Sequence, residues 1–390
     1  MTYREYLLGD ISTFKYGSMP KKDLISESGY PIFTGYKYVG FYPSYNIDKE
    51  SIIVVARGVG GTGDVKICPA KTHLTNLSIA FEINENILNK KYFYYKYSLS
   101  NLRYLDSGSA QSQITINDLK RIKLELPHIK EQKAIANILS SLDDKIELNN
   151  KINKNLEEIA QTLYKQWFVD FEFPNGDGEP YKSSGGEMVE SELGLIPKGW
   201  NISDFDKILT LIKEPTKPGE HLHKRVYVPI DKLQSKHLVL SEYKPYTDAN
   251  SSLILFDKFD ILIGAMRVYF HKVNLSFNQG VTRTTTFVLR SKSIYEVPFN
   301  LLTLNQDAAI DYANGTSKGS TMPYAVWENA FSRYAIVDPN IKIKKKFFDI
   351  VMPKLQLLNN NNIQNIKLQK IRDELLPKLM NGEIEVPIEE

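Results

Sequence analysis

The chain has 390 residues, of which 42% are hydrophobic and 24% charged, values typical of a folded protein. This length exceeds what one hydrophobic core usually organises, so we expect two domains with connecting segments. The sequence shows no apolar run of membrane-spanning length and no apolar signal core, so we expect a cytoplasmic protein without a membrane partner. A single cysteine, Cys68, excludes a disulfide framework and a cysteine-based zinc site, and we expect it to be a buried strand thiol.

The net charge of +3 is unevenly distributed along the chain. Residues 1–127 carry 16 Lys and Arg against 12 Asp and Glu, and residues 193–338 carry 17 against 14. The stretch 171–192 between them carries one lysine against six acids. Two mildly basic blocks are compatible with surfaces that meet a polyanion. An excess this small is nevertheless more typical, by itself, of an ordinary solvated surface.

Residues 1–127 form a first block in which strand and turn patterns dominate. Residues 51–56 predict a buried strand, and residues 77–83 predict a second strand with alternating apolar positions. Residues 89–105 predict a helix with an aromatic face, and residues 122–126 predict a strand that ends before a proline. The block is therefore expected to be a mixed α/β globule.

A long helix is predicted within residues 128–170. Its stretch 131–168 contains neither Pro nor Gly, and apolar or amide side chains recur at steps of four and three. This heptad pattern is typical of a helix that packs along its length against another helix, here expected from the same chain. About 40 helical residues would span roughly 60 Å, longer than an ordinary domain helix. The seam positions are Ile135, Leu139, Leu142, Ile146, Asn149, Asn153, Leu156, Ala160, Leu163 and Trp167.

Residues 171–192 are rich in Gly, Pro, Ser and acidic residues, and we expect an exposed linker there. Residues 193–338 then repeat the plan of the first block. Strands are predicted at 260–265 and 285–289, and a helix is predicted at 298–313. A polar loop follows this helix, as a polar loop follows the helix of the first block.

A second long helix is predicted within residues 339–390. Pro353 should break it early, so we expect the helix to begin there, where proline is tolerated. The run Lys354-Leu-Gln-Leu matches Lys145-Ile-Glu-Leu of the first helix, and asparagines follow in both copies. The fold class is therefore expected to be α+β, a tandem repeat of a mixed α/β globule and a long helix, offset by about 210 residues. Buried amides such as Asn149 and Asn153 would fix the register of the paired helices.

The glycine cluster at 58–63 matches the dinucleotide-binding pattern G-x-G-x-x-G, but its context argues against a nucleotide site. Such a site needs a helix that starts at the last glycine, whereas the β-branched segment 64–69 predicts a hairpin. We expect a flexible loop beside Arg57, with Arg267 at the matching place of the second block. Arginine at a strand end is usually a surface ion-pair partner, but it can also reach a guanine edge or a phosphate.

No residue is assigned to catalysis or to metal binding. His221 and His223 have no further ligands at a familiar spacing, so ordinary surface histidines are expected. The sequence contains no known nucleophile, metalloprotease or phosphate-loop motif. It also lacks the tetrapeptide typical of amino-methyltransferases that act on bases.

Two polar loops stand at equivalent places, each after a helix and before a strand. One contains Gln111-Ser-Gln-Ile-Thr, and the other contains Ser320-Thr-Met-Pro-Tyr. Gln, Ser and Thr can bond base edges and phosphates, and Tyr324 could stack or donate. Composition alone favours ordinary caps and turns. The repeat favours DNA contacts, because two like modules suit a split target.

Six segments of the chain form a recognisable set of motifs. They are Gln111-Ser-Gln-Ile-Thr-Ile-Asn-Asp-Leu-Lys-Arg-Ile, residues 131–149, residues 160–171, Leu195-Ile-Pro-Lys-Gly-Trp, Gly319-Ser-Thr-Met-Pro and residues 375–384. Together they resemble the specificity subunit of type I restriction–modification systems. The resemblance covers essentially the whole chain, is specific in the helical regions and is weak in the bodies of the two blocks. Tyr3 stands where the second module has Trp200, and the first glycine-rich loop has no counterpart in the second block.

The resemblance implies two target recognition domains, 1–127 and 193–338, separated by an antiparallel intramolecular coiled coil. It implies a non-catalytic chain that reads a bipartite DNA sequence, with half-sites about one helical turn, or some 34 Å, apart on one DNA face. The implied partners are double-stranded DNA and two modification subunits, with restriction subunits as further candidates. S-adenosylmethionine would be bound by the modification subunits, and no cofactor by this chain.

Specific residues are predicted for the two kinds of contact. The DNA-facing candidates are Arg57, Lys71, Gln111 and Gln113 in the first domain and Arg267, Arg283, Lys318 and Tyr324 in the second. The candidates for contact with the modification subunits are Asp143, Asp144, Glu157 and Glu158, on the outward faces of the helices. For any single one of these acids a solvated surface is the simpler explanation.

Two other classes of function remain open. One is a structural coiled-coil scaffold that joins two protein-binding domains, and salt-dependent DNA binding would count against it. The other is an enzyme with an unfamiliar site, which methyl transfer by the purified chain would support. The target bases and the spacer length cannot be read from the sequence.

Overall fold

The computed structural model describes residues 3–58, 61–98, 100–106 and 112–387. The chain forms two compact units: unit 1 comprises Met1–Ile146 and Lys367–Glu390, and unit 2 comprises Glu147–Ile366. The division falls within the two long helices, so each unit contains part of both. No helix in the described part of the chain is long and apolar enough to cross a membrane.

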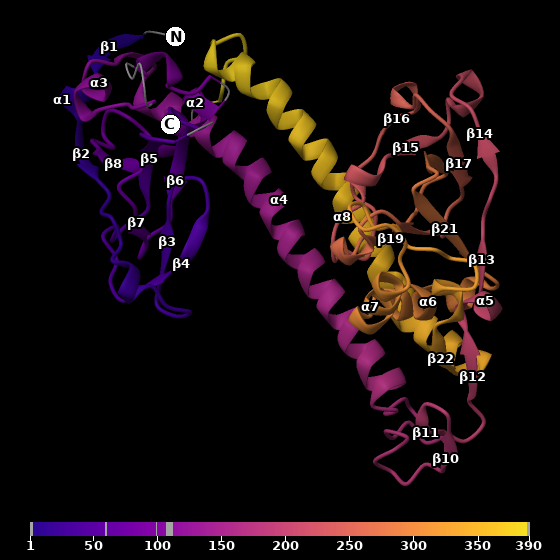
Figure 1. Ribbon diagram of the computed structural model, residues 1–390. Helices are drawn as coiled ribbons and strands as arrows, with labels where there is room; N and C mark the ends of the chain where they lie inside the picture. The colour runs from indigo at the N-terminus through magenta and orange to yellow at the C-terminus, as the bar shows by residue number, and fades with distance from the viewer. Residues whose placement is uncertain (1–2, 59–60, 99, 107–111, 388–390) are drawn as a thin grey trace. The chain divides into compact units, whose positions relative to one another are not determined.

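Unit 1 is built on a four-stranded antiparallel sheet with the order β2-β8-β5-β6, shown in indigo and violet in Figure 1. A three-stranded sheet, β4-β3-β7, and a pair, β1-β9, complete its strands. Its strands are β1 (Arg4–Leu7), β2 (Ser12–Tyr16), β3 (Tyr30–Phe33), β4 (Tyr38–Tyr42), β5 (Ser51–Val55), β6 (Val65–Cys68), β7 (His73–Leu74), β8 (Ser78–Ile83) and β9 (Lys123–Leu126). Its short helices are α1 (Leu8–Ile11), α2 (Lys90–Ser98) and α3 (Ile116–Lys120).

The core of unit 1 lies between the central strands and helix α2. All five residues of β5 are buried, as its apolar run predicts. Helix α2 contributes buried Tyr92 and Phe93, and the Phe93 ring packs edge-on against Phe81 of β8. Helix α2 is shorter than predicted because the chain turns after it, with Asn101 at a positive φ of 44°.

Unit 2 contains a second four-stranded antiparallel sheet, with the order β13-β21-β18-β19. A five-stranded sheet, β14-β17-β20-β15-β16, and the pairs β12-β22 and β10-β11 accompany it. Its strands are β10 (Met188–Ser191), β11 (Gly194–Pro197), β12 (Asn201–Asp204), β13 (Leu209–Leu211), β14 (Pro215–Thr216), β15 (Val226–Val228), β16 (Lys244–Pro245), β17 (Leu253–Phe256), β18 (Ile261–Gly264), β19 (Val273–Leu275), β20 (Gly280–Arg283), β21 (Thr286–Ser291) and β22 (Ala335–Asp338). Its short helices are α5 (Phe205–Ile208), α6 (Val297–Leu304) and α7 (Asp307–Gly315).

The two four-stranded sheets have the same order and the same antiparallel pairing. In each unit a short helix leads from a paired outer strand into the sheet, α1 after β1 and α5 after β12. In each unit the last strand before a long helix, β9 or β22, pairs with that outer strand. The second sheets differ, since unit 1 has three strands where unit 2 has five.

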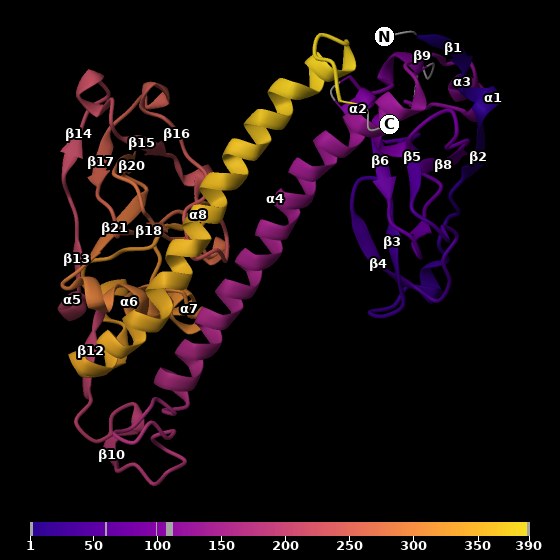
Figure 2. The same cartoon turned by 180° about the vertical axis from the view of Figure 1, so that it is seen from behind.

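The long helices α4 (Ile129–Tyr164) and α8 (Ile341–Met380) lie side by side, as both views show (Figures 1 and 2). In unit 2, Asn149 donates to Asn365 over 2.8 Å, and Asn153 donates to Asn362 over 2.8 Å. Partner numbers fall along α8 as they rise along α4, so the bonded stretch is antiparallel. In unit 1, Arg372 of α8 donates to Asp143 of α4 over 2.7 Å.

Helix α8 corrects the prediction that Pro353 begins the second long helix. The helix starts at Ile341 and continues through Pro353. A proline inside a helix removes one backbone hydrogen bond to the carbonyl four residues earlier. Pro353 is exposed, so water can satisfy that carbonyl, while buried Val351 and Leu355 hold the same turn in the core of unit 2.

Most residues of the segment 171–192 are exposed, as predicted, but the segment also contains ordered contacts. Helix α4 passes into a π-helical turn, Lys165–Val169, and Phe173 then stacks on Trp200 with ring centroids 4.8 Å apart. Strands β10 and β11 close a hairpin. Phe173 is the one buried residue of this segment, so an aromatic contact anchors an otherwise exposed stretch to unit 2. The helix predicted at 298–313 is likewise divided, because Gln306 has an extended backbone and separates α6 from α7.

Candidate nucleic-acid interface

Both units contain the same crossing just beyond the central strand of the four-stranded sheet. In unit 1, the Ile114 N–H donates to the Ala56 carbonyl over 2.9 Å, and Arg57 forms a β-bridge with Gln113. In unit 2, the Ala325 N–H donates to the Ala265 carbonyl over 2.8 Å. The corresponding bridge joins Met266 to Tyr324. The polar loop of each unit is therefore fixed to the end of its central strand.

By this equivalence Arg57 corresponds in position to Met266. The sequence had predicted that Arg57 corresponds to Arg267, so the prediction was off by one residue. Arg267 follows Met266 in the left-handed conformation, with φ 50°. Its N–H donates to the Pro323 carbonyl over 2.8 Å. The offset was present in the sequence, because Arg57 follows Ala56 directly whereas Met266 stands between Ala265 and Arg267.

The glycine cluster of unit 1 has a packing role. The Tyr36 hydroxyl donates to the Arg57 carbonyl over 3.0 Å. A Cβ on Gly58 would approach the Tyr36 hydroxyl to 2.5 Å, and a Cβ on Gly61 would approach the Tyr36 ring to 2.2 Å. These two glycines thus allow close packing against Tyr36, whereas residues 59–60, which the flexible loop was expected to include, lie outside the described residues. Strand β6 follows and pairs antiparallel with β5, so the predicted hairpin is confirmed.

Asp106 organises the described end of the unit 1 polar loop. Its carboxylate accepts from the Gln113 N–H over 2.8 Å and from the Ser112 hydroxyl. This arrangement leaves the Gln113 side chain half-buried beside exposed Arg57. Gln111, also predicted to face DNA, lies outside the described residues.

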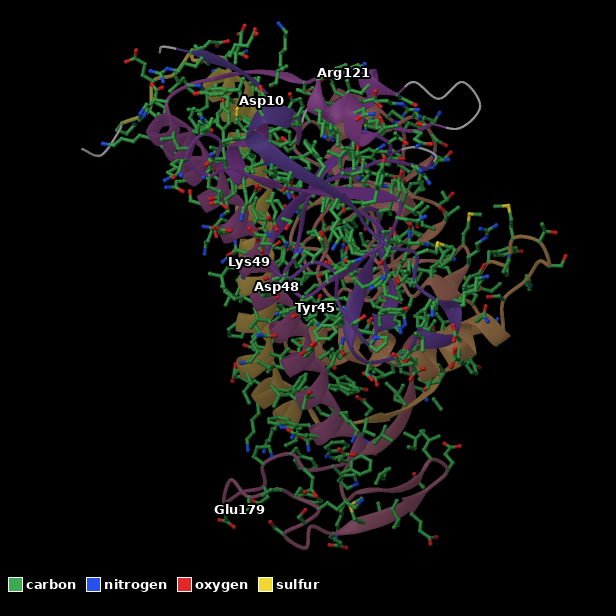
Figure 3. The ribbon with its side chains drawn as sticks, turned by 90° about the vertical axis from the view of Figure 1, so that its left-hand side faces the viewer. Asp10, Tyr45, Asp48, Lys49, Arg121 and Glu179 are labelled. Atoms are coloured by element: carbon green, nitrogen blue, oxygen red, sulfur yellow. The ribbon has the colours of Figure 1, made fainter. Side chains whose placement is uncertain are left out.

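Lys71 belongs to a different place in unit 1. Its ammonium group pairs with Asp48 and donates to the Tyr45 hydroxyl over 2.9 Å. The loop carrying Tyr45, Asp48 and Lys49 is labelled in Figure 3. The hydrogen bond that Lys71 donates to Asp48 is the main cause that raises the pKa of Lys71. The lysine is thus charged but already neutralised by a carboxylate, which makes it the weakest of the DNA-facing candidates.

The unit 2 loop is a closed hairpin. Lys318 and Tyr324 exchange two backbone hydrogen bonds of 2.9 Å each, and Gly319 supplies the turn with φ +91°. Lys318 and Arg267 are exposed, and the Tyr324 ring is 49% exposed. The structure therefore brings these three predicted residues to one surface of unit 2.

Arg283 lies next to this surface. It ends strand β20 and is half-buried, and Thr284 and Thr285 follow it directly. These two threonines line a cavity of about 410 Å³ together with Tyr324. Four predicted residues of unit 2 thus lie on or beside one cavity, whereas in unit 1 only Arg57 and Gln113 are brought together.

Comparison with known proteins identifies this architecture. Residues 2–158 match the family model described as the type I restriction modification DNA specificity domain. Over most of its length the chain is also similar to curated type I specificity subunits. The resemblance read from the sequence motifs is thereby confirmed.

Two curated proteins are similar to this chain over most of its length. It is 29% identical to the type I restriction enzyme MjaIX specificity subunit of Methanocaldococcus jannaschii, over 87% of this chain and 78% of the relative. It is 26% identical to the HindI specificity subunit of Haemophilus influenzae, over 70% and 71% of the two chains. Its fold is similar to the crystal structure of a type I system S subunit from M. genitalium, with a TM-score of 0.65, 19% identity and 97% and 96% coverage.

The four acids predicted to contact partner subunits fall into two groups. Asp143 accepts from Arg372 and, over 2.6 Å, from the Tyr95 hydroxyl. Glu157 is only 7% exposed and accepts from the Leu238 N–H over 2.7 Å. Both are engaged within their own unit, so neither lies free on an outward face. Asp144 and Glu158 remain exposed, at 69% and 61% of their side chains.

Glu157 also bonds the His237 ring over 3.2 Å. This hydrogen bond is the main cause that raises the pKa of His237, and burial opposes it. The pair fixes the 237–238 segment to helix α4 inside unit 2. This contact is structural. It could not be predicted from the sequence, because 80 residues separate Glu157 from His237.

The remaining titratable candidates have local partners. His221 bonds the Thr216 hydroxyl over 2.9 Å, and His223 bonds the Glu220 carbonyl over 3.1 Å. The described residues contain no group of three or more His, Cys, Asp or Glu side chains arranged to hold a metal ion. Cys68 is buried, as predicted, and burial raises its pKa to about 11.

Sequence reasoning missed Tyr36, Met266 and Met322 in these two surfaces. Tyr36 supports the Arg57 backbone, while Met266 and Met322 line the unit 2 cavity. Met322 is 52% exposed although it is apolar. The signal available in the sequence was a methionine in an otherwise polar loop, next to a proline.

Proposed function

We propose that this chain is the DNA-recognition subunit of a type I restriction–modification complex, and that each unit reads one half of a bipartite target. The observation that carries the proposal is the recurrence of one crossing, with an exposed arginine at or beside the strand end, in both units. Arginine can bond guanine bidentately, and Gln or Tyr can bond base edges or phosphates. One chain with two such protein surfaces could bind the two halves of a DNA target at the same time.

In this proposal, α4 and α8 pair as an antiparallel intramolecular coiled coil between the two recognition domains of a tandem repeat. The cross-helix amide bonds of unit 2 and the Arg372–Asp143 pair of unit 1 support the pairing. The equal strand orders of the two sheets support the repeat. A rigid helix pair would set the number of bases between the half-sites.

The chemistry of methyl transfer belongs to partner subunits in this proposal. Two modification subunits would use S-adenosylmethionine to methylate adenine, and restriction subunits are further candidate partners. The recognition chain itself would be non-catalytic and would select the sequence. Its expected place, with its DNA, is the cytoplasm.

Exposed apolar side chains on the long helices offer a seat for the modification subunits. In unit 2, Leu148 and Ile159 of α4 are 50% and 44% exposed, and Leu357 of α8 is 45% exposed. Leu148 and Ile159 stand eleven residues apart, three helical turns, so they share one face. Exposed apolar positions of this kind mark interaction sites. Asp144 and Glu158 would contribute charge beside them.

DNA binding by the complete chain with its modification subunits tests the proposal. Fluorescence anisotropy on a duplex carrying the methylated motif should show specific binding whose logarithmic affinity falls linearly with the logarithm of salt concentration. The paired variant R57A/R267A should bind more weakly, while K71A, whose charge is already paired, serves as the matched control. Binding that ignores sequence and salt would instead favour a structural scaffold between two protein-binding domains.

A further inference from the structure

The cavity beside the unit 2 surface has an unusual lining for a DNA-facing site. Its volume is about 410 Å³. Most of its walls are apolar or aromatic, and its polar groups are mainly threonine hydroxyls. The lining includes Met266, Thr285, Phe287, Met322, Tyr324 and Trp327.

The floor of this cavity is fixed. Trp327 is only 3% exposed and packs edge-on against Phe331, with ring centroids 5.6 Å apart. Glu328 is the only charged residue of the lining, and its carboxylate forms an ion pair with Lys213. The interior therefore offers apolar contact and little uncommitted charge.

The rim of the cavity is both rigid and basic. The hairpin that carries Met322 and Tyr324 is closed by two backbone bonds of 2.9 Å and is tied to Arg267 by a third of 2.8 Å. The head groups of Arg267 and Lys318 have no ion pair with another described residue. The basic rim thus attracts a polyanion, whereas the opening of the cavity binds an apolar group more favourably than a polar one.

We infer that this cavity receives the methyl group of a thymine in the half-site read by unit 2. The inference rests on the proposed DNA-recognition function and names the base feature read there. In the major groove of unmodified DNA the thymine methyl is the one apolar group that projects from a base edge, since cytosine carries only a hydrogen at the same position and the other groups are mainly hydrogen-bond donors and acceptors. A donor or acceptor placed against Met322 and Phe287 would lose its water without a partner, whereas a methyl group gains by leaving water.

The equivalent crossing in unit 1 has a different chemistry. Arg57 stands where unit 2 has Met266, and Gln113 stands where unit 2 has Tyr324. Both unit 1 residues present hydrogen-bonding groups. At equivalent places of the backbone, unit 1 therefore has a polar DNA-facing surface and unit 2 has an apolar one. We assign recognition of the thymine methyl group to unit 2 alone.

The test uses the full chain assembled with its modification subunits and synthetic duplexes without methylated bases, so that thymine is the only source of a base methyl group. Each thymine of the target is replaced in turn by deoxyuridine, which removes only that methyl group, and affinities are compared by competition. At one position in one half-site, affinity should fall about fourfold, the factor that corresponds to burial of one methyl group. T285L, which fills the cavity, and M322A, which removes part of its rim, should each bring that ratio close to one.

M19A provides the matched control, because Met19 is an exposed methionine of unit 1 and should leave the ratio unchanged. Met322 is itself exposed, so M322A keeps the test valid if T285L folds poorly. Specific binding that is indifferent to deoxyuridine at every position, or a ratio that survives M322A, would overturn this inference alone. A target whose half-sites both lack A·T pairs would overturn it as well. Absence of specific DNA binding would overturn the proposed function.

Discussion

At the residue scale, the DNA-facing candidates differ in whether their charges are already used. Lys71 is paired with Asp48, whereas Arg267 and Lys318 have exposed head groups beside one cavity. The sequence predicted an arginine at matching places of the two units, but the structure puts Arg57 at the β-bridge and Arg267 one residue beyond it. The sequence could not rank the DNA-facing candidates, because ion pairing with a residue 23 positions away is a tertiary property.

Replacing Arg267 by alanine should weaken specific binding by about 1–3 kcal/mol and relax discrimination at one base position, as loss of a bidentate arginine–guanine contact does. Competition binding against duplexes with single base changes measures both effects. R333A is a suitable control, since Arg333 is also an exposed arginine of unit 2 but faces Asp204. Unchanged specificity in R267A would show that Arg267 does not read a base.

The His237–Glu157 contact should make the stability of unit 2 depend on pH. The folded state raises the pKa of His237 through its bond to Glu157, so the protonated pair stabilises the fold below the unfolded pKa of about 6.5, and this contribution is lost as pH rises through the folded pKa. Urea unfolding of the wild type and of H237Q should therefore differ more in acid than above neutral pH. A difference that is constant with pH would show that the pair carries no proton linkage.

At the element scale, the strands of both four-stranded sheets could be predicted from their apolar runs. Three features could not. The division of 298–313 depends on one extended residue, Gln306. The packing of 171–192 depends on Phe173 meeting Trp200, and the continuity of α8 through Pro353 depends on the buried residues around it. In each case tertiary packing overrides the local signal.

The side-chain hydrogen bond between Asn149 of α4 and Asn365 of α8 predicts different stabilities for single and double replacement by leucine. N149L alone removes the amide donor that bonds the Asn365 side-chain oxygen and leaves that oxygen of a buried residue without its partner, which costs about 1–3 kcal/mol. N149L/N365L replaces both members by apolar groups, so it should recover most of the loss while weakening control of the helix register. Denaturant midpoints measure the stabilities, and equal midpoints for the single and double variants would contradict a coupled amide pair.

Pro353 provides a second test of the helix pair. P353A restores the missing N–H and removes the ring from the helix interior, so it should stabilise the chain, by up to about 3 kcal/mol. P353G restores the same N–H but has a lower helix propensity, so its gain should be smaller by about 1 kcal/mol. Thermal or urea unfolding gives the comparison. A destabilised P353A would mean that the helix geometry around residue 353 requires proline.

At the scale of the whole molecule, one chain carries two units with equal sheet order and different surface chemistry. The sequence motifs led to the resemblance to type I specificity subunits and to the prediction of a tandem repeat. They could not locate the boundary of the compact units, which falls within α4 and α8 rather than at 128 or 193. A helix that belongs to two units shows no break in its sequence pattern.

The seat for the modification subunits is testable at this scale. I159E places a charge on the exposed apolar face of α4, so it should weaken assembly with the modification subunits while leaving the fold intact, because Ile159 is 44% exposed. Analytical ultracentrifugation of the mixed subunits measures the fraction that assembles into a complex. L193E, which changes an equally exposed leucine at the β10–β11 turn, is the matched control. Full assembly of I159E would place the seat elsewhere.

Methylation mapping of host DNA, with and without this chain, tests the central claim most directly. The account predicts an adenine methylation motif of two half-sites that disappears without the chain, becomes relaxed in one half in R57A and becomes relaxed in the other half in R267A. A motif that persists without the chain, or variants in the two units that relax the same half, would contradict it.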